Sequence, residues 1–272
     1  MKNINLISSI TLACLSTITS TVAYADYPDV IINSDIILNY DQKIDLRPAI
    51  SVPTVADLPD ADISVNQFNH ESPIKAVGRV VNNRPSGNYG EVISEVDVEV
   101  TAVGNNASID VSGSANPVIG AVQGNQWSSH TAIGEISNNR IDLAEDKIVN
   151  LEVTSVGNNL SIDAENSADV ESIGLGSIQF NYDSPTAAIG SIVGNGFGVN
   201  ARGVDPTLTV TAVGNNLSSL APTTGSLTQI NRGSPVTATG LVSRNTGKIG
   251  PINVSVTAVG NNISIKQPST GE

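Results

Sequence analysis

Cysteine, aromatic residues and charged residues are all scarce in this sequence of 272 residues. It has one Cys and one Trp, aromatic residues make up 3% of the chain, and charged residues make up only 14%. So few large rings argue against the core of a conventional globular enzyme, and so little charge argues against an acidic disordered chain. The formal net charge of -13 disfavours binding to nucleic acid or to anionic membranes. Small and β-branched residues remain to build a core, which is typical of repetitive β structure.

Side chains for catalysis or metal binding are also few. His70 and His130 are the only histidines, and they fall at different positions of the repeats in this chain. No G-x-S-x-G or other nucleophile motif is present, and no His/Cys spacing suits zinc. Acidic clusters near Asp57 and Glu95 follow no Ca²⁺-binding pattern, so a solvated strand face is favoured there. The sequence predicts that the protein is not an enzyme and has no catalytic residue, metal or cofactor.

The N-terminal residues have the pattern of a secretory signal peptide. Lys2 precedes an apolar stretch from Ile4 to Ile18, and Ala23-Tyr24-Ala25 matches the small-x-small cleavage pattern. Residues 1–25 are therefore predicted to be removed, so that the mature chain starts at Asp26. No later stretch reaches the 18 apolar residues of a membrane-spanning helix. We expect the protein to be secreted to the extracellular space or the outer cell surface, with the periplasm as a transit compartment.

Four copies of a two-block unit fill most of the chain. The first block reads Q-x-N-x-x-S-[PS]-x-x-A-x-G-x-[VI]-x-x-N, and its copies begin at Gln67, Gln123, Gln179 and Gln229, with spacings of 56, 56 and 50 residues. The second block is similar in every copy, as in VEVTAVGNNASI from Val98. Such close self-similarity is the signature of a repeat protein. We therefore predict a repeat domain over residues 63–272.

Both blocks are predicted to form β-strands joined by corners. The second block alternates, which places Val98, Val100 and Ala102 on one face and Glu99 and Thr101 on the other. In the first block, Ser-Pro indicates a turn and Ala-x-Gly-x-Ile indicates a strand that is tightly packed at its Gly. The Gly of Gly-Asn-Asn is expected to end each strand of the second block at a positive φ. These expected turn glycines are Gly104, Gly157, Gly214 and Gly260.

These elements predict an all-β fold, a β-solenoid of four imperfect repeats of 50–56 residues. Further glycine markers at Gly120 and Gly174 indicate coils of about 14–26 residues, hence roughly ten to twelve coils and a rod of roughly 50–60 Å. Equivalent amides are expected to form Asn and Gln ladders from coil to coil, and to carry both fold and self-association. Phe68 and Phe180 are interpreted as intermittent packing. The expected ladder members are Gln67, Gln123, Gln179, Gln229, Asn69, Asn125, Asn181, Asn231, Asn106, Asn159, Asn216 and Asn262.

The segment V-T-A-V-G-N-N-x-S-I and the Gln-x-Asn that opens the first block resemble the repeats of curlins, the subunits of curli. Curlins are secreted bacterial proteins whose Gln/Asn/Gly repeats stack as a β-solenoid and polymerise into surface fibres. Holdfast-anchoring and other biofilm matrix proteins resemble them in the same way. The resemblance covers about residues 63–268 and implies a functional amyloid of the bacterial surface. This sequence departs from the pattern in its longer unit, and in Ala102 or Ser155 where a curlin repeat has Gln.

Charge is distributed unevenly along the mature chain. Residues 26–62 hold eight acidic and two basic residues, and they are interpreted either as a cap on the first coil or as a signal for a secretion or assembly partner. Residues 26–210 carry 25 acidic and 8 basic residues, whereas 211–272 carry one acidic and four basic residues. One interpretation is drift among solvated residues. The other is head-to-tail docking of the basic end onto the acidic start of another copy, through Arg232, Arg244 and Lys248.

The sequence therefore favours a secreted structural or adhesive protein whose partners are copies of itself or other matrix and fibre subunits. The alternative is a non-polymerising β-solenoid that binds a glycan or another surface ligand. One column of Thr residues would suit a binding face, but a single Thr per repeat is expected to leave several coils between neighbours. A polysaccharide-cleaving enzyme is disfavoured because basic residues are few and scattered. The Thr column consists of Thr101, Thr154, Thr211 and Thr257.

Overall fold

The computed structural model of the chain describes ten stretches of residues. They are 23–25, 30–36, 50–52, 62–82, 96–111, 117–141, 149–163, 172–197, 205–247 and 249–265. These residues form strands and no helix, which confirms the predicted all-β class. Three five-stranded sheets and one three-stranded sheet contain the strands, and each sheet is open, with two edge strands.

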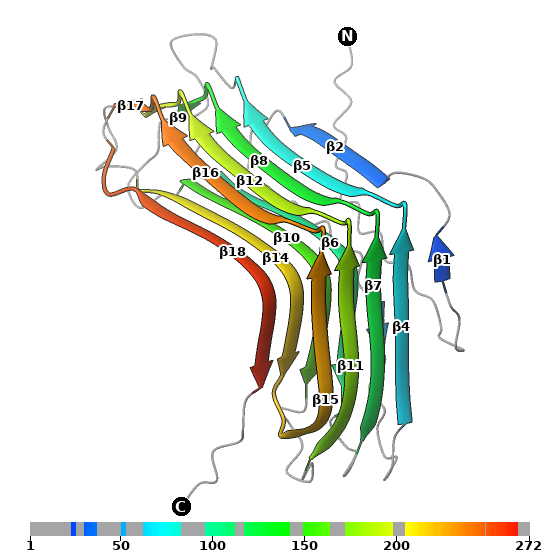
Figure 1. Cartoon of the computed structure of the whole chain (residues 1–272). Helices are drawn as coiled ribbons and strands as arrows, with labels where there is room; N and C mark the ends of the chain where they lie inside the picture. The colour runs from blue at the N-terminus through cyan, green and yellow to red at the C-terminus, as the bar shows by residue number, and fades with distance from the viewer. Residues whose placement is uncertain are drawn as a thin grey trace, which may run out of the picture.

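Each repeat adds one strand to each of the three large sheets, in chain order (Figure 1). Sheet 1 contains β1 (Ala23–Ala25), β4 (Asp62–His70), β7 (Val118–Gln126), β11 (Ile173–Tyr182) and β15 (Thr223–Arg232). Sheet 2 contains β2 (Val30–Ile36), β5 (Ile74–Val81), β8 (His130–Ser137), β12 (Thr186–Val193) and β16 (Val236–Ser243). Sheet 3 contains β3 (Ile50–Val52), β6 (Val96–Asp110), β10 (Val149–Asp163), β14 (Pro206–Ser219) and β18 (Asn253–Ile265). The small sheet consists of β9 (Arg140–Ile141), β13 (Gly196–Phe197) and β17 (Thr246–Gly247).

Neighbouring strands are parallel and pair residues one repeat apart. Gln67 pairs with Gln123, Gln123 with Gln179, and Gln179 with Gln229, and the second blocks align in the same way in sheet 3. One repeat therefore makes one layer, with one strand in each large sheet. The described residues of the four repeats form four such layers, which we number 1 to 4 along the chain.

The predicted coil of 14–26 residues, and with it the count of ten to twelve coils, is wrong. Gly120 lies inside β7 and pairs with Ser64 and Gly176, and Gly174 lies inside β11. Both glycines are therefore positions within long strands and do not mark the end of a coil. Five strands at ~4.8 Å span roughly 20 Å across a sheet, not the predicted 50–60 Å.

The chain passes from sheet 1 to sheet 2 at the predicted Ser-Pro corner. The residue before each corner Ser has a positive φ in all four layers, between 47° at Asp183 and 63° at Gly233. The backbone N–H of Ser128 donates to the hydroxyl of Ser184 at 3.0 Å, and that of Ser184 donates to the hydroxyl of Ser234 at 2.9 Å. The predicted turn is confirmed, and its hydroxyl groups tie one layer to the next.

The Gly-Asn-Asn segments lie inside the strands of sheet 3, and these strands bend along their length (Figure 1). Their glycines are not among the residues with positive φ, so the predicted strand end at a positive φ is wrong. A Cβ on Gly157 would lie 2.5 Å from the carbonyl oxygen of Gly214. Glycine is therefore required by the close approach of neighbouring layers, not by the φ angle. The same argument applies to the equivalent positions Gly104 and Gly214.

The bend divides the interior into two apolar clusters. Before the bend, sheet 3 packs on sheet 2 and buries side chains such as Val100, Leu151 and Ile136. After the bend, it packs on sheet 1 and buries Leu160 and Ile173, among others. The predicted tight packing at the Gly of Ala-x-Gly-x-Ile is confirmed in the first cluster. A Cβ on this Gly in layer 2 would lie 2.5 Å from a methyl carbon of the facing Val of β10.

Candidate assembly surface

A column of Gln side chains forms a continuous ladder near the bend. Each Nε2 donates to the Oε1 of the preceding layer: Gln123 to Gln67 at 2.6 Å, Gln179 to Gln123 at 2.7 Å, and Gln229 to Gln179 at 2.7 Å. The same Nε2 also donates to a backbone carbonyl of sheet 3 in its own layer, as Gln179 does to Asn216 at 2.8 Å. These bonds satisfy amides whose burial without a partner costs about 1–3 kcal/mol each.

The expected Asn residues form two further ladders of opposite direction. In sheet 1, each Nδ2 donates to the Oδ1 of the following layer, through Asn69, Asn125, Asn181 and Asn231, at 2.9, 2.8 and 2.8 Å. In sheet 3, each Nδ2 donates to the Oδ1 of the preceding layer, through Asn262, Asn216, Asn159 and Asn106, at 2.6, 2.7 and 2.6 Å. Every ladder therefore has a donor end and an acceptor end.

Two more ladders were not predicted from the sequence. The first Asn of each Gly-Asn-Asn points inward and donates to the next layer, through Asn105, Asn158, Asn215 and Asn261, at 2.7, 2.7 and 2.8 Å. A fifth ladder joins Asn139, Asn195 and Asn245, with bonds of 3.0 Å. These three residues end the 17-residue first block. Their constancy at that position was the signal that could have identified them.

His130 is fully buried beside these ladders. A Cβ on Gly104 would overlap with the Nε2 of His130, and neither ring nitrogen has a hydrogen-bond partner among the described residues. Burial lowers the pKa of His130 to about 4, because an imidazolium ion would lose its hydration there. The equivalent residues of the other layers are Ile74, Thr186 and Val236, so an uncharged side chain fits this position.

Wild type is expected to lose stability in acid because of His130. Replacing His130 with Val, the residue at the equivalent position of layer 4, should prevent this loss. Between the unfolded pKa of 6.5 and the folded pKa of about 4, the unfolded chain binds a proton that the folded chain does not. The free energy of unfolding therefore falls as the pH falls through this range, by about 2 kcal/mol at pH 5. Urea unfolding of both proteins at pH 7.5 and pH 5 measures this change. If the free energies of unfolding of wild type and His130→Val differed by the same amount at both pH values, this would contradict the interpretation of His130 as buried and neutral.

Layer 4 is uncovered and exposes the apolar residues of its core columns. In β14, Leu208, Val210 and Leu217 are at most 1% exposed. Their partners in β18 are Val254, Val256 and Ile263, which are 49%, 45% and 46% exposed. Figure 1 shows β15, β16 and β18 at one end of the stack, drawn in orange to red. Each of these side chains is a core residue with no further layer over it among the described residues.

The Gln ladder also ends unsatisfied at this surface. The Oε1 atom of Gln229 is buried and has no hydrogen-bond partner among the described residues, whereas Oε1 of each preceding Gln accepts a bond from the next layer. At the other end, Gln67 pairs with Ala23, which carries no amide. The ladder thus has its acceptor end in layer 4 and its donor end in layer 1.

Two of the three predicted docking charges are placed in layer 4. Arg232 and Arg244 are exposed, the first at the end of β15 and the second at the corner after β16, with a φ of 55°. Lys248 lies outside the described residues. Their role in docking stays a prediction.

The predicted Thr column lies on the outer face of sheet 3. Thr101, Thr154, Thr211 and Thr257 pair on directly adjacent strands. The expected separation by several coils is therefore wrong, because each repeat is a single layer. Thr101 is only 5% exposed, so the column is not open to solvent along its whole length.

Comparison of the chain with protein-family models, curated proteins and solved structures gave no match. In the part of the chain that the structure describes, no helix is long and apolar enough to cross a membrane. Among the same residues, no three His, Cys, Asp or Glu side chains are grouped as a metal site would require.

Proposed function

We propose that the four layers form a β-solenoid that stacks head to tail into extracellular fibres, or anchors such fibres, as a secreted structural or adhesive protein. The observation that carries this proposal is the exposed surface of layer 4. Side chains such as Val254 and Ile263, which are about half exposed, have partners one layer earlier that are fully buried. The surface that fits this end best is another copy of the same repeat, because that is what covers every earlier layer.

The direction of the ladders supports head-to-tail stacking. If layer 4 of one copy meets layer 1 of the next, Nε2 of Gln67 in the second copy faces the unsatisfied Oε1 of Gln229 in the first. Head-to-head stacking would bring together the acceptor ends of two Gln ladders. It would also make the strands of the two copies antiparallel. A contact between two different surfaces that repeats along one axis does not close into a ring, so it continues into a filament.

The N-terminal strands support the interpretation of residues 26–62 as a cap. β1 lies in the predicted signal peptide, so cleavage leaves β4 as the edge of sheet 1. In the part of this segment that the structure describes, β2 and β3 cover β5 and β6 with 7 and 3 residues. The corresponding strands of layer 4 have 8 and 13 residues, so a second copy can replace this cap with more hydrogen bonds. The acidic cap and the basic C-terminal repeat also attract one another before contact.

Crosslinking of single Cys variants tests this polarity. Residues 26–272 contain no Cys, and Asn66 and Thr228 occupy one column in layers 1 and 4. Both side chains are exposed. We expect a short bismaleimide to join Asn66→Cys to Thr228→Cys when the two proteins are mixed, and to join neither variant to itself.

The control is Ile189→Cys. Ile189 lies on sheet 2 and is 41% exposed, so this variant should not crosslink to Asn66→Cys. Crosslinks between two Thr228→Cys molecules would show head-to-head contact. Either that result, or fibres without the mixed crosslink, would contradict the proposal.

A further inference from the structure

Aromatic side chains gather on the outer face of sheet 1 and in the corner after β7, although they are rare in the chain. The sequence has three Phe, five Tyr and one Trp, and four of these nine lie in one patch with His70. The ring centroids are 5.9 Å apart for Phe68 and Phe180, 5.1 Å for Phe180 and Tyr182, and 5.1 Å for His70 and Trp127. We call these five residues the aromatic patch. It extends across layers 1 to 3.

Packing within the fold does not account for this patch. Trp127 is 51% exposed at the corner position where all four layers have a positive φ. The equivalent residue in layer 4 is Gly233, which suits that angle without strain. The prediction that Phe68 and Phe180 serve only as intermittent packing does not account for Trp127 and Tyr182, which belong to the same patch. A half-exposed Trp beside a second ring is typical of a binding surface.

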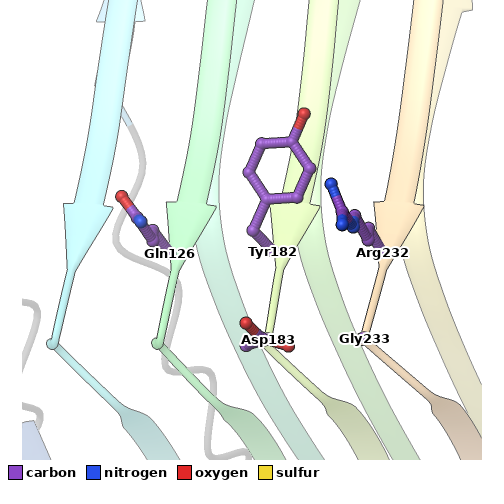
Figure 2. Close-up of a pocket in the computed structure, with 5 residues that line it drawn as sticks. All are labelled: Gln126, Tyr182, Asp183, Arg232 and Gly233. Carbon is purple, nitrogen blue, oxygen red and sulfur yellow. The ribbon is translucent and has the colours of Figure 1, made fainter.

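A shallow pocket of about 440 Å³ adjoins the patch (Figure 2). Gln126, Tyr182 and Arg232 project from the ends of three adjacent strands, and Asp183 and Gly233 follow in the corners. The amide, the phenol and the guanidinium group donate hydrogen bonds, and the amide, the phenol and the carboxylate accept them. The pocket therefore combines aromatic surface with hydrogen-bonding groups of both kinds, spaced ~4.8 Å apart by the strands.

We propose that the aromatic patch and its pocket bind an extended β-1,4-linked oligosaccharide. A pyranose ring has apolar C–H faces and a rim of hydroxyl groups. The faces match the rings of Trp127 and Tyr182, and the hydroxyls match Gln126, Asp183 and Arg232. A flat, extended saccharide also suits an open pocket that crosses several strands.

The structure disfavours other classes of ligand here. A peptide that joined as an extra strand would lie at an edge of sheet 1 and not over the patch, because β7 and β11 are paired on both sides. The net charge of -13 disfavours nucleic acid. The patch lies in layers 1 to 3 and faces outward from sheet 1, whereas Arg232 and Gly233 of the adjoining pocket belong to layer 4. Binding is therefore measured on the monomer, in which stacking plays no part.

Trp127 is the only Trp of the chain, so its fluorescence reports on this site alone. Monomeric residues 26–272 are titrated with cellohexaose, with N-acetylchitohexaose and with a β-1,4-linked mannuronate hexamer. The last of these tests whether Arg232 favours a carboxylate. We expect a saturable change in emission with at least one hexasaccharide. No saturable change with any of the three would overturn the proposal.

Variants that copy the residues of other layers locate the binding. Trp127→Gly copies Gly233, and Tyr182→Gln copies Gln126, so both replacements suit the backbone. Each is expected to weaken binding at least about tenfold by isothermal titration calorimetry. The control Ile189→Thr copies Thr239 and removes an exposed side chain of sheet 2, so it should bind as wild type does.

Unchanged affinity in both patch variants would place the saccharide elsewhere and overturn the assignment. Fibre formation is followed in the same proteins and should not change. Loss of assembly in Trp127→Gly would show instead that the patch contacts a second copy.

Discussion

Replacing Val256 with Asp is expected to abolish fibre growth while the monomer stays folded. Val256 is 45% exposed in layer 4, so the new carboxylate remains hydrated in the monomer. In a head-to-tail contact it would be buried against apolar side chains of the next copy, which costs several kcal/mol. A loss of about 3 kcal/mol slows or weakens the growth step more than about a hundredfold. Thioflavin T fluorescence and electron microscopy measure the result.

The matched control is Val210→Asp, the same change one layer earlier. Val210 pairs with Val256 but is 0% exposed, so its carboxylate would be buried within the monomer itself. This variant is expected to lose its folded β structure by circular dichroism. If Val256→Asp formed fibres at the wild-type rate, the uncovered surface of layer 4 would not be the growing end.

Replacing Gly157 with Val is expected to be the most destabilising change at the bend. A Cβ there would lie 2.5 Å from the carbonyl oxygen of Gly214 and 3.0 Å from the side-chain amide of Asn181. The overlap would push layers 2 and 3 apart and break the ladder bonds between them. Overpacking and unsatisfied buried amides each cost about 1–3 kcal/mol, so we expect a loss of about 4 kcal/mol in the free energy of unfolding. Urea unfolding measures this loss.

Gly176→Val provides the control for this prediction. Gly176 also lies in a strand, in β11, but no heavy atom lies within 4 Å of a Cβ built there. Because Val favours strands, the stability of this variant should stay within about 0.5 kcal/mol of wild type or rise. Equal losses in the two variants would show that the close contact at the bend is not the cause.

Chemical periodicity made much of the fold predictable. The four Gln residues, the Ser-Pro corners and the alternation of the second block recur at fixed spacing, and residues that recur in this way pair in register in parallel sheets. The amide residues expected to form ladders are indeed hydrogen-bonded along their columns. These hydrogen bonds within one chain do not test the predicted role of the amide residues in self-association.

The size of a layer was not predictable, because glycine has several roles that the sequence does not distinguish. Gly120 lies in mid-strand and Gly157 allows two backbones to approach, yet both looked like the ends of strands. The aromatic patch was not predicted either, because its prediction depends on the size of a layer. Its members His70 and Trp127 are 57 positions apart in the sequence, and they become neighbours only when one whole repeat makes one layer.

Incubation of purified residues 26–272 without agitation tests head-to-tail assembly most directly. Electron microscopy and thioflavin T fluorescence are recorded on the same samples, with and without fragments of preformed fibres. Head-to-tail assembly should give unbranched fibres and a lag phase that added fragments abolish, because each fragment exposes layer 4. A protein that stays monomeric and rich in β structure at every concentration, with or without fragments, would contradict head-to-tail assembly.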